Sequence, residues 1–247
     1  MWDKIKRFLF PGSGTCAYCR GNLKNTIGTN QPLELCAACY QNIPWIKDIL
    51  CPTCGRYETC HDCRRRVDPA FVRNRSAVRY NATMKEWLSR WKYRGDERLL
   101  QLFAGMLLHA YHKHLEMLGE SDGFDFVVYV PLSQERLQER GFNQAEQLAL
   151  RLSQQIGVPV VELLTRVRHT DKQSFKGRKE RLQDLRDAFA IEIKTLQAML
   201  TRQKQVNRSL RLLLIDDVYT TGSTLQQCAK IIRGNVQAQV YGLTWAR

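Results

Sequence analysis

Residues 211–224 read Arg-Leu-Leu-Leu-Ile-Asp-Asp-Val-Tyr-Thr-Thr-Gly-Ser-Thr, and this stretch decides the fold. The apolar run 212–215 is typical of a parallel strand buried on both faces. It ends at two adjacent carboxylates, Asp216 and Asp217, and a hydroxyl-rich loop around Gly222 follows. A helical pattern then runs from Leu225 to Ile232. Strand, loop and helix in this order predict an α/β sheet with a ligand crevice at the carboxyl end of the strand.

The loop after the carboxylates has the composition of a phosphate-binding loop. Its hydroxyls and backbone N–H groups can surround a phosphate, and the next helix directs its positive end toward that group. Gly222 permits close approach of the backbone, while the carboxylates suit ribose hydroxyls and a Mg²⁺ ion. The string resembles the phosphoribosyl diphosphate (PRPP) signature of type I phosphoribosyltransferases and neither a Walker A nor a dinucleotide motif. The residues expected to bind PRPP with Mg²⁺ are Asp216, Asp217, Thr220, Thr221, Gly222, Ser223 and Thr224.

Working outward, apolar runs predict three further buried strands near 124–131, 158–162 and 236–245, and a helix at 145–155. Together they predict a parallel twisted sheet, and the resemblance of the 212–224 string implies that the fold is type I phosphoribosyltransferase-like. The helical segment 83–118 is expected to form a hood. We therefore expect a Cys-rich zinc-ribbon module at 1–66 and a phosphoribosyltransferase-like domain at 67–247. Within that domain we place the hood at about 75–120 and the core at about 121–247.

Eight of the nine cysteines lie near the front of the chain in four Cys-x-x-Cys pairs. Two pairs can complete one tetrahedral Zn²⁺ site, so four pairs suggest two ions. The first four have zinc-ribbon spacing, but the second two pairs are so close that crossed pairing between the sets is an alternative. A disulfide scaffold is disfavoured because the chain shows no secretion signal. The predicted ligands are Cys16, Cys19, Cys36, Cys39, Cys51, Cys54, Cys60 and Cys63.

A segment of this size has too little apolar area to fold alone, so metal would supply the missing stability. Zinc ribbons contact nucleic acid or present a protein-binding surface, and the composition does not separate these roles. The ninth cysteine, Cys228, is expected to be a buried structural thiol on the helix after the phosphate loop.

The charge is strongly positive: 38 Lys and Arg against 24 Asp and Glu give +14. Segment 64–98 holds eleven basic and four acidic residues, a net +7, and segment 165–211 holds thirteen and five, a net +8. Basic side chains with interleaved aromatic rings suit single-stranded DNA. Trp87 and Trp91 have helical spacing, however, so at least one of them is expected in the core. The candidate nucleic-acid-binding residues are Arg64, Arg65, Arg66, Lys92 and Arg94.

The first apolar stretch ends at Pro11, and the longest later one, Leu99 to Tyr111, is interrupted and short. Neither matches a signal-peptide core or the roughly 20 residues of a membrane span. We expect a cytoplasmic protein, with peripheral association at the inner face of the membrane left open.

Several short motifs occur together along the chain and indicate a family. They are four Cys-x-x-Cys pairs, Lys92-Tyr-x-Gly-Asp96, Arg140-Gly-Phe-Asn-Gln144, Arg166-x-x-x-Thr170-x-x-Gln173 and Asp216-Asp-x-x-Thr-Thr-Gly222. In this order they resemble the ComF/GntX family from Cys16 to Trp245. The resemblance implies a zinc-binding domain before a type I phosphoribosyltransferase domain. It also implies a role in the uptake of transforming single-stranded DNA beside a ComFA-type ATP-dependent helicase.

The same resemblance adds Arg140 and Arg166 to the expected PRPP-binding residues. Family members with one zinc site keep the two earlier Cys pairs, which favours pairing within each set of four. The chain departs from the family between Arg181 and Phe189, where Asp184 and Asp187 replace the usual Asn and Gly. Three hypotheses therefore remain: a module that binds PRPP or a DNA sugar-phosphate, a transferase with an unknown acceptor base, and a PRPP-sensing regulator.

Overall fold

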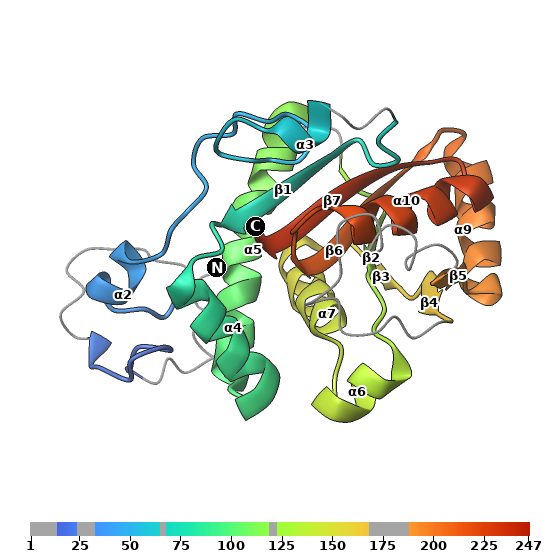
Figure 1. The fold of residues 1–247 in the computed structure, drawn as a ribbon. Coiled ribbons are helices and arrows are strands. Elements are labelled where there is room, and N and C mark those ends of the chain that lie inside the picture. Colours follow the sequence, from blue (N-terminus) through green and yellow to red (C-terminus); the bar gives the residue numbers. More distant parts are fainter. Residues whose placement is uncertain (1–13, 24–32, 65–67, 119–122, 168–187) are drawn as a thin grey trace, which may run out of the picture.

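The computed structural model describes residues 14–23, 33–64, 68–118, 123–167 and 188–247. A five-stranded sheet with the order β1-β7-β6-β2-β3 forms its centre, and every neighbouring pair of strands is parallel (Figure 1). The predicted α/β fold class is confirmed, as are the four predicted strands. The strands are β1 (Arg73–Val78), β2 (Phe126–Tyr129), β3 (Val160–Val161), β6 (Leu210–Val218) and β7 (Ala238–Ala246).

Strand β6 lies in the middle of the sheet, between β2 and β7. Its run Leu212–Ile215 is fully buried, because both faces of the sheet are covered by helices. Helices α5 (Glu97–Leu118) and α7 (Gln144–Ile156) pack against each other on one face, and α10 (Ser223–Asn235) lies on the other (Figure 1). Cys228, on α10, is fully buried, which confirms its predicted structural role.

The segment that we expected to form a hood contains two helices, α4 (Ala82–Arg94) and α5. Helix α4 begins after Asn81, whose side chain accepts a hydrogen bond from the Met84 N–H at 2.9 Å, and ends at Gly95 with a φ of 62°. Helix α5 contacts β1 and β7 directly, so part of this segment covers the sheet. Trp87 and Trp91 on α4 are both buried, which confirms the expectation of a core tryptophan.

Strand β1 is an edge strand that the sequence pattern did not predict. Its Asn74 and Ser76 side chains are buried and hydrogen-bonded: the Asn74 amide donates to Ser76 Oγ at 3.1 Å. Ser76 Oγ lies 2.6 Å from Thr244 Oγ1 on β7. Because this polar network replaces apolar side chains, β1 carries no hydrophobic signature.

The remaining described elements surround this core. They are α2 (Ala37–Gln41), α3 (His61–Arg64), α6 (Gln134–Arg140), α9 (Ile193–Val206) and an antiparallel pair, β4 (Leu164–Arg166) with β5 (Phe189–Ile191). The Thr170 and Gln173 motif positions and the departure at 181–187 lie outside the described residues. No helix within the described ranges is long and apolar enough to cross a membrane.

Candidate phosphoribosyl site and metal centres

Asp216 and Asp217 lie near the carboxyl end of β6, where an open α/β sheet forms its ligand crevice. Short backbone hydrogen bonds fix both side chains. The Asp217 N–H donates to Asp216 Oδ1 at 2.9 Å, and the Val218 N–H donates to Asp217 Oδ1 at 2.7 Å. The structure therefore places both predicted carboxylates together at the start of the phosphate loop.

Lys92 reaches these carboxylates from α4, and its Nζ forms an ion pair with Asp217 Oδ2. The sequence-based hypothesis assigned Lys92 to nucleic acid. The family motif Lys92-Tyr-x-Gly-Asp96 was the signal that could have placed it here, because its lysine faces another motif of the same family, Asp216-Asp217. Lys92 thus supplies a cation where the diphosphate of PRPP would bring negative charge.

The two adjacent carboxyl groups have opposite pKa shifts. Burial and the charge of Asp217 raise the pKa of Asp216 well above its usual value. Burial alone would also raise the pKa of Asp217, but Lys92 lowers it to below the usual value. Lys92 therefore neutralises Asp217 directly, while the carboxyl group of Asp216 holds its proton more tightly than usual.

The loop 220–224 provides the groups that a phosphate requires. Thr221 Oγ1 lies 2.7 Å from Ser223 Oγ, so two predicted hydroxyls face each other. Gly222 caps α10 with a φ of 76° and offers no side-chain hydrogen bond to the helix. The Ser223 N–H, the first of α10, donates to Thr221 Oγ1 at 3.3 Å, so the loop hydroxyls lie at the positive end of the helix, which attracts an anion.

Gly222→Ala is expected to weaken this loop and lower the free energy of unfolding by about 1–3 kcal/mol. A Cβ at Gly222 would overlap the Tyr219 ring and hydroxyl, in addition to the strain of a positive φ. Urea denaturation measures the loss, and calorimetry with PRPP should show weaker binding. Gly234→Ala is the matched control on α10, because nothing lies within 4 Å of its Cβ. Equal effects of both variants would contradict the role of Gly222.

Both predicted arginines are brought toward the carboxylates. Arg140, the last residue of α6, lies 5.7 Å over the Tyr93 ring, and its charge helps lower the pKa of Asp217. Arg166, on β4, has its pKa lowered by burial and by Arg136, while Cys228 and Asp216 act to raise it. Arg140 and Arg166 thus bring positive charge toward Asp217 and Asp216, respectively.

The eight predicted zinc ligands form two groups of four. In each group the four sulfurs all lie within 4.8 Å of one another, close enough for a single ion. We call Cys16, Cys19, Cys36 and Cys39 the first cluster, and Cys51, Cys54, Cys60 and Cys63 the second cluster. This grouping excludes crossed pairing between the two sets.

The thiols are also chemically suited to a metal. Burial alone would raise the pKa of Cys16, but the backbone N–H groups of Cys36, Cys19 and Tyr18 lower it to about 7. For Cys60 burial likewise acts upward, while the Cys63 N–H and the neighbouring thiols bring the pKa to about 7. Four thiol ligands with N–H donors are the donor set that Zn²⁺ prefers, so each cluster can hold one zinc ion.

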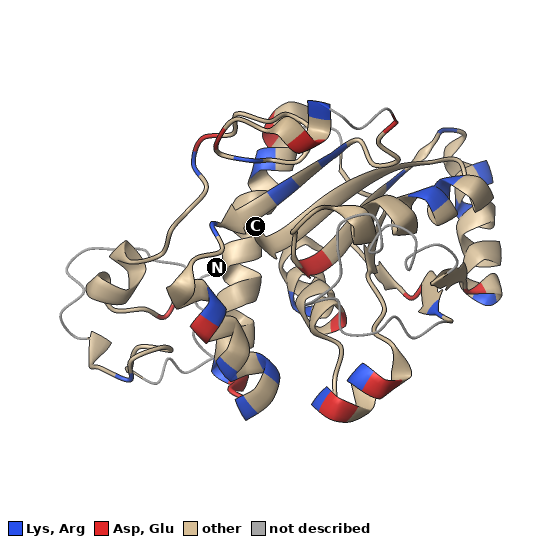
Figure 2. Ribbon diagram, viewed as in Figure 1, with Lys and Arg blue, Asp and Glu red and all other residues tan. Residues whose placement is uncertain are grey.

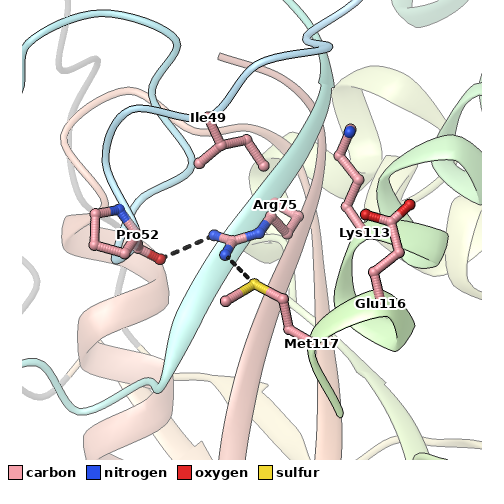
Figure 3. Close-up of a pocket in the computed structure, with 6 residues that line it drawn as sticks. All are labelled: Ile49, Pro52, Arg75, Lys113, Glu116 and Met117. Carbon is pink, nitrogen blue, oxygen red and sulfur yellow. Dashed lines mark hydrogen bonds between the residues drawn. The ribbon is translucent and has the colours of Figure 1, made fainter. Parts of the chain in front are cut away.

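The second cluster is attached to the sheet by hydrogen bonds to its backbone. Arg75 on β1 is 1% exposed and donates to the Pro52 carbonyl at 2.9 Å, with Met117 Sδ 3.0 Å from its other terminal nitrogen (Figure 3). The Asn74 N–H donates to the Thr53 carbonyl at 2.7 Å. Arg247, after β7, donates to the Cys54 carbonyl at 2.5 Å. These bonds join the metal-binding hairpin to both β1 and the end of β7.

The first cluster contacts a different part of the molecule. Tyr18, between two of its cysteines, stacks on Trp87 of α4 with ring centroids 4.3 Å apart. The Tyr18 hydroxyl donates to Glu86 at 3.3 Å, and Arg90 lies 4.8 Å over the Tyr18 ring. The first cluster therefore packs on α4, whereas the second packs on the sheet.

The predicted nucleic-acid-binding arginines are only partly visible in this structure. Arg64 and Arg94 are exposed, at the ends of α3 and α4, while Arg65 and Arg66 lie outside the described residues. Basic residues are spread over several elements (Figure 2). Arg75 is buried, and Arg90 is ion-paired with Asp96 at 2.8 Å. Some of the basic residues of segment 64–98 are thus buried or ion-paired within the protein, so part of its net +7 is not offered to a partner.

Comparison with curated proteins supports the motif-based assignment. The chain is 30% identical to competence protein F of Haemophilus influenzae, over 94% of this chain and 96% of that protein. The chain belongs to the ComF family. It is also 32% identical to competence protein ComFC of Bacillus subtilis, over 81% of this chain and 78% of ComFC. The DNA utilization protein YhgH of Escherichia coli is 28% identical over 77% of the chain and 81% of YhgH.

Solved structures similar to this ComF-family chain are distant. One is an adenine phosphoribosyltransferase from Thermoanaerobacter pseudethanolicus, with 16% identity over 56% of this chain and 81% of that one, at a TM-score of 0.28. The allosteric regulatory enzyme of purine biosynthesis has 16% identity at a TM-score of 0.30, and the match spans 26% of its length. No protein-family model matches the chain. The fold assignment rests on the strand order and on the position of Asp216-Asp217.

Proposed function

We propose that this ComF-family protein acts in the uptake of transforming single-stranded DNA and binds a phosphoribosyl group at the site formed by Asp216, Asp217 and residues 220–224. The observation that carries the proposal is this carboxylate pair followed by a hydroxyl-rich loop at the N-terminus of α10, in a chain whose relatives are named for competence. The phosphoribosyl ligand is PRPP with Mg²⁺ or the sugar-phosphate of a DNA strand.

The proposal includes two zinc ions, one in each cluster, because each cluster has four thiols at ligand distance. It also includes a ComFA-type helicase as the partner that drives the strand with ATP. Such a partner would hold the protein at the inner face of the membrane, in the cytoplasm. The exposed Arg64 and Arg94 are the described residues offered to DNA phosphates.

DNA binding through the basic surface gives a salt-dependent affinity. If about five phosphates are neutralised, log affinity is expected to fall against log salt with a slope near −3.5, at about −0.7 per phosphate. Replacing Arg64, Arg65 and Arg66 by Ala is expected to flatten the slope by up to about two units. Fluorescence anisotropy with labelled oligothymidylate measures both slopes.

The exposed Lys230 on α10 lies outside both basic segments, so Lys230→Ala is a control that should leave the slope unchanged. Little preference among base sequences is expected, because phosphate contacts carry no base readout. Unchanged affinity and slope after neutralising both basic segments would count against DNA as the partner.

A transferase reaction is the second candidate, favoured by the complete carboxylate pair and hydroxyl loop. In that reaction an acceptor base would displace the diphosphate of PRPP. Release of diphosphate on mixing PRPP, Mg²⁺ and individual bases with the protein would establish it. If no base causes release of diphosphate while calorimetry shows that PRPP binds, the result supports a protein that binds PRPP without transferring its phosphoribosyl group.

A further inference from the structure

A groove of about 270 Å³ lies between the second cluster and the phosphate loop. One wall comes from residues 56–58, which follow Cys54 in the metal-binding hairpin, and the other from residues 218–220, which lead into the loop. Tyr57 and Tyr80 line it together with Thr220 and Arg247. The groove is therefore continuous with the phosphate loop at Thr220.

A third tyrosine extends this surface toward the carboxylates. Tyr93, on α4, is 60% exposed, and Tyr80 is 39% exposed. Tyr93 follows Lys92, which pairs with Asp217, and Tyr80 lines the groove together with Val218, the residue after Asp217. Tyr93 and Tyr80 thus come from residues near the carboxylate end of β6, and Tyr80 and Tyr57 share the groove beside the second cluster. We call Tyr93, Tyr80 and Tyr57 the tyrosine track.

Arginines accompany the track. Arg140 lies 5.7 Å over the Tyr93 ring, and the exposed Arg79 lies 4.1 Å over the Tyr57 ring. At the floor of the groove Arg247 lies 4.7 Å over the ring of Tyr219. Each cation lies over one face of its ring and adds positive charge beside it.

Three acidic groups near the track lie beside cations. Glu58 lies 4.0 Å from Arg56, which also pairs with Asp62 at 3.5 Å, and Asp217 pairs with Lys92. Arg56 can neutralise only one of Glu58 and Asp62. The further cations Arg79, Arg140 and Arg247 outnumber the carboxylates that remain, so the net charge beside the track is positive. Two exposed rings, Tyr80 and Tyr93, and the partly exposed ring of Tyr57, with positive charge beside them, complement a polyanion that carries aromatic bases.

We infer that the tyrosine track stacks successive bases of single-stranded DNA, leading the strand from the phosphoribosyl site to the second cluster. The inference rests on the proposed function and names the residues that would perform it. Three separate rings require several linked bases, so an oligonucleotide suits the track better than one free nucleotide. Because every base has an aromatic face, the track would accept any sequence, as a DNA-uptake protein requires.

The test uses the full-length protein and labelled oligothymidylates. Tyr57→Ala and Tyr80→Ala are each expected to lower affinity about 10-fold, within the range for loss of one stacked base. Tyr57→Phe and Tyr80→Phe keep the ring and are expected to stay within about 2-fold of the original protein. The salt slope should be the same in all four variants, since it counts phosphates and not stacked rings.

An oligonucleotide with abasic positions separates stacking from folding. The affinity of the original protein for this abasic oligonucleotide should be about as low as the affinity of the Ala variants for the intact one. Replacing the intact oligonucleotide by the abasic one should lower the affinity of the Ala variants only slightly further. Zinc content and thermal midpoint of Tyr57→Ala check that the hairpin is intact.

The outcomes distinguish the two proposals. If the unaltered protein does not bind oligothymidylate, the proposed function itself fails and the track with it. If it binds and the Ala variants bind equally well, only the track is overturned. Thymidine monophosphate binding as tightly as the oligonucleotide would also overturn the track and would indicate an acceptor pocket for a single base.

Discussion

Simultaneous replacement of Asp216 and Asp217 by Asn is expected to lower the affinity for PRPP with Mg²⁺ by at least about 100-fold. Two charge-assisted contacts, to the metal or to ribose hydroxyls, are lost together, each worth about 1.5–3 kcal/mol. The carboxylates lie at the strand end, where they accept local backbone N–H groups and pair with Lys92, so the sheet does not depend on their charge. Isothermal titration calorimetry measures the change.

Stability measurements show whether the double variant remains folded. The raised pKa of Asp216 means that the folded protein holds its proton more tightly than the unfolded chain does. Ionised Asp216 therefore lowers stability as the pH rises through its folded-state pKa. Above that pH, the single variant Asp216→Asn is expected to be at least as stable as the original protein.

The exposed Asp48 offers a matched control, because Asp48→Asn removes one charge far from the loop in sequence and should leave PRPP affinity unchanged. Unchanged affinity in the double variant would show that Asp216 and Asp217 do not hold the ligand.

Metal content gives the other large effect. Reduced, freshly purified protein is expected to carry two zinc ions, one for each of the two clusters. Cys54→Ser with Cys60→Ser should reduce this to one ion and lower the thermal midpoint sharply, since a structural zinc site contributes about 10–16 kcal/mol of apparent binding free energy. Elemental analysis and differential scanning calorimetry measure the two changes.

Replacing Cys16 and Cys19 by Ser should also remove one ion, with a smaller effect on the sheet. Three of four thiols in the second cluster are buried, against one of four in the first. The second cluster also hydrogen-bonds to β1 and Arg247, whereas the first contacts α4 through Tyr18. We expect the Cys16 and Cys19 variant to lose solubility before it loses PRPP binding. Metal-free protein with an unchanged thermal midpoint would contradict a structural role for zinc.

The central strand and its loop could be predicted because the buried residues and the candidate ligand-binding residues are consecutive in the sequence. Leu212–Ile215 are apolar since β6 is covered on both faces, and the two carboxylates follow at once. The cysteine ligands could also be predicted, because the two cysteines of each pair are separated by only two residues. Their spacing left crossed pairing open, the family resemblance favoured pairing within each set of four, and the structure shows that grouping.

The features that could not be predicted from the sequence depend on contacts between residues that are far apart in the chain. Strand β1 is polar because Asn74 and Ser76 bond to Thr244 across the sheet, so periodicity had nothing to detect. Lys92 lies in a basic segment, and only the folded chain brings it to Asp217. Tyr80 and Tyr57 come from separate segments and meet in one groove. The fold brings these residues together, so their contacts cannot be predicted from the spacing of neighbouring residues.

The pairing of β1 with β7 sets an order of events during synthesis. Residue Arg73 finds its partner Tyr241 only near the completion of the described chain. The cysteines of the second cluster emerge from the ribosome long before that and can bind metal at once, because all four lie within one short hairpin. The seat of this hairpin, formed by β1 and Arg247, is complete only after β7 has been made. The hairpin can therefore bind a metal before the sheet edge closes, and its contact with Arg247 forms only after β7 has been made.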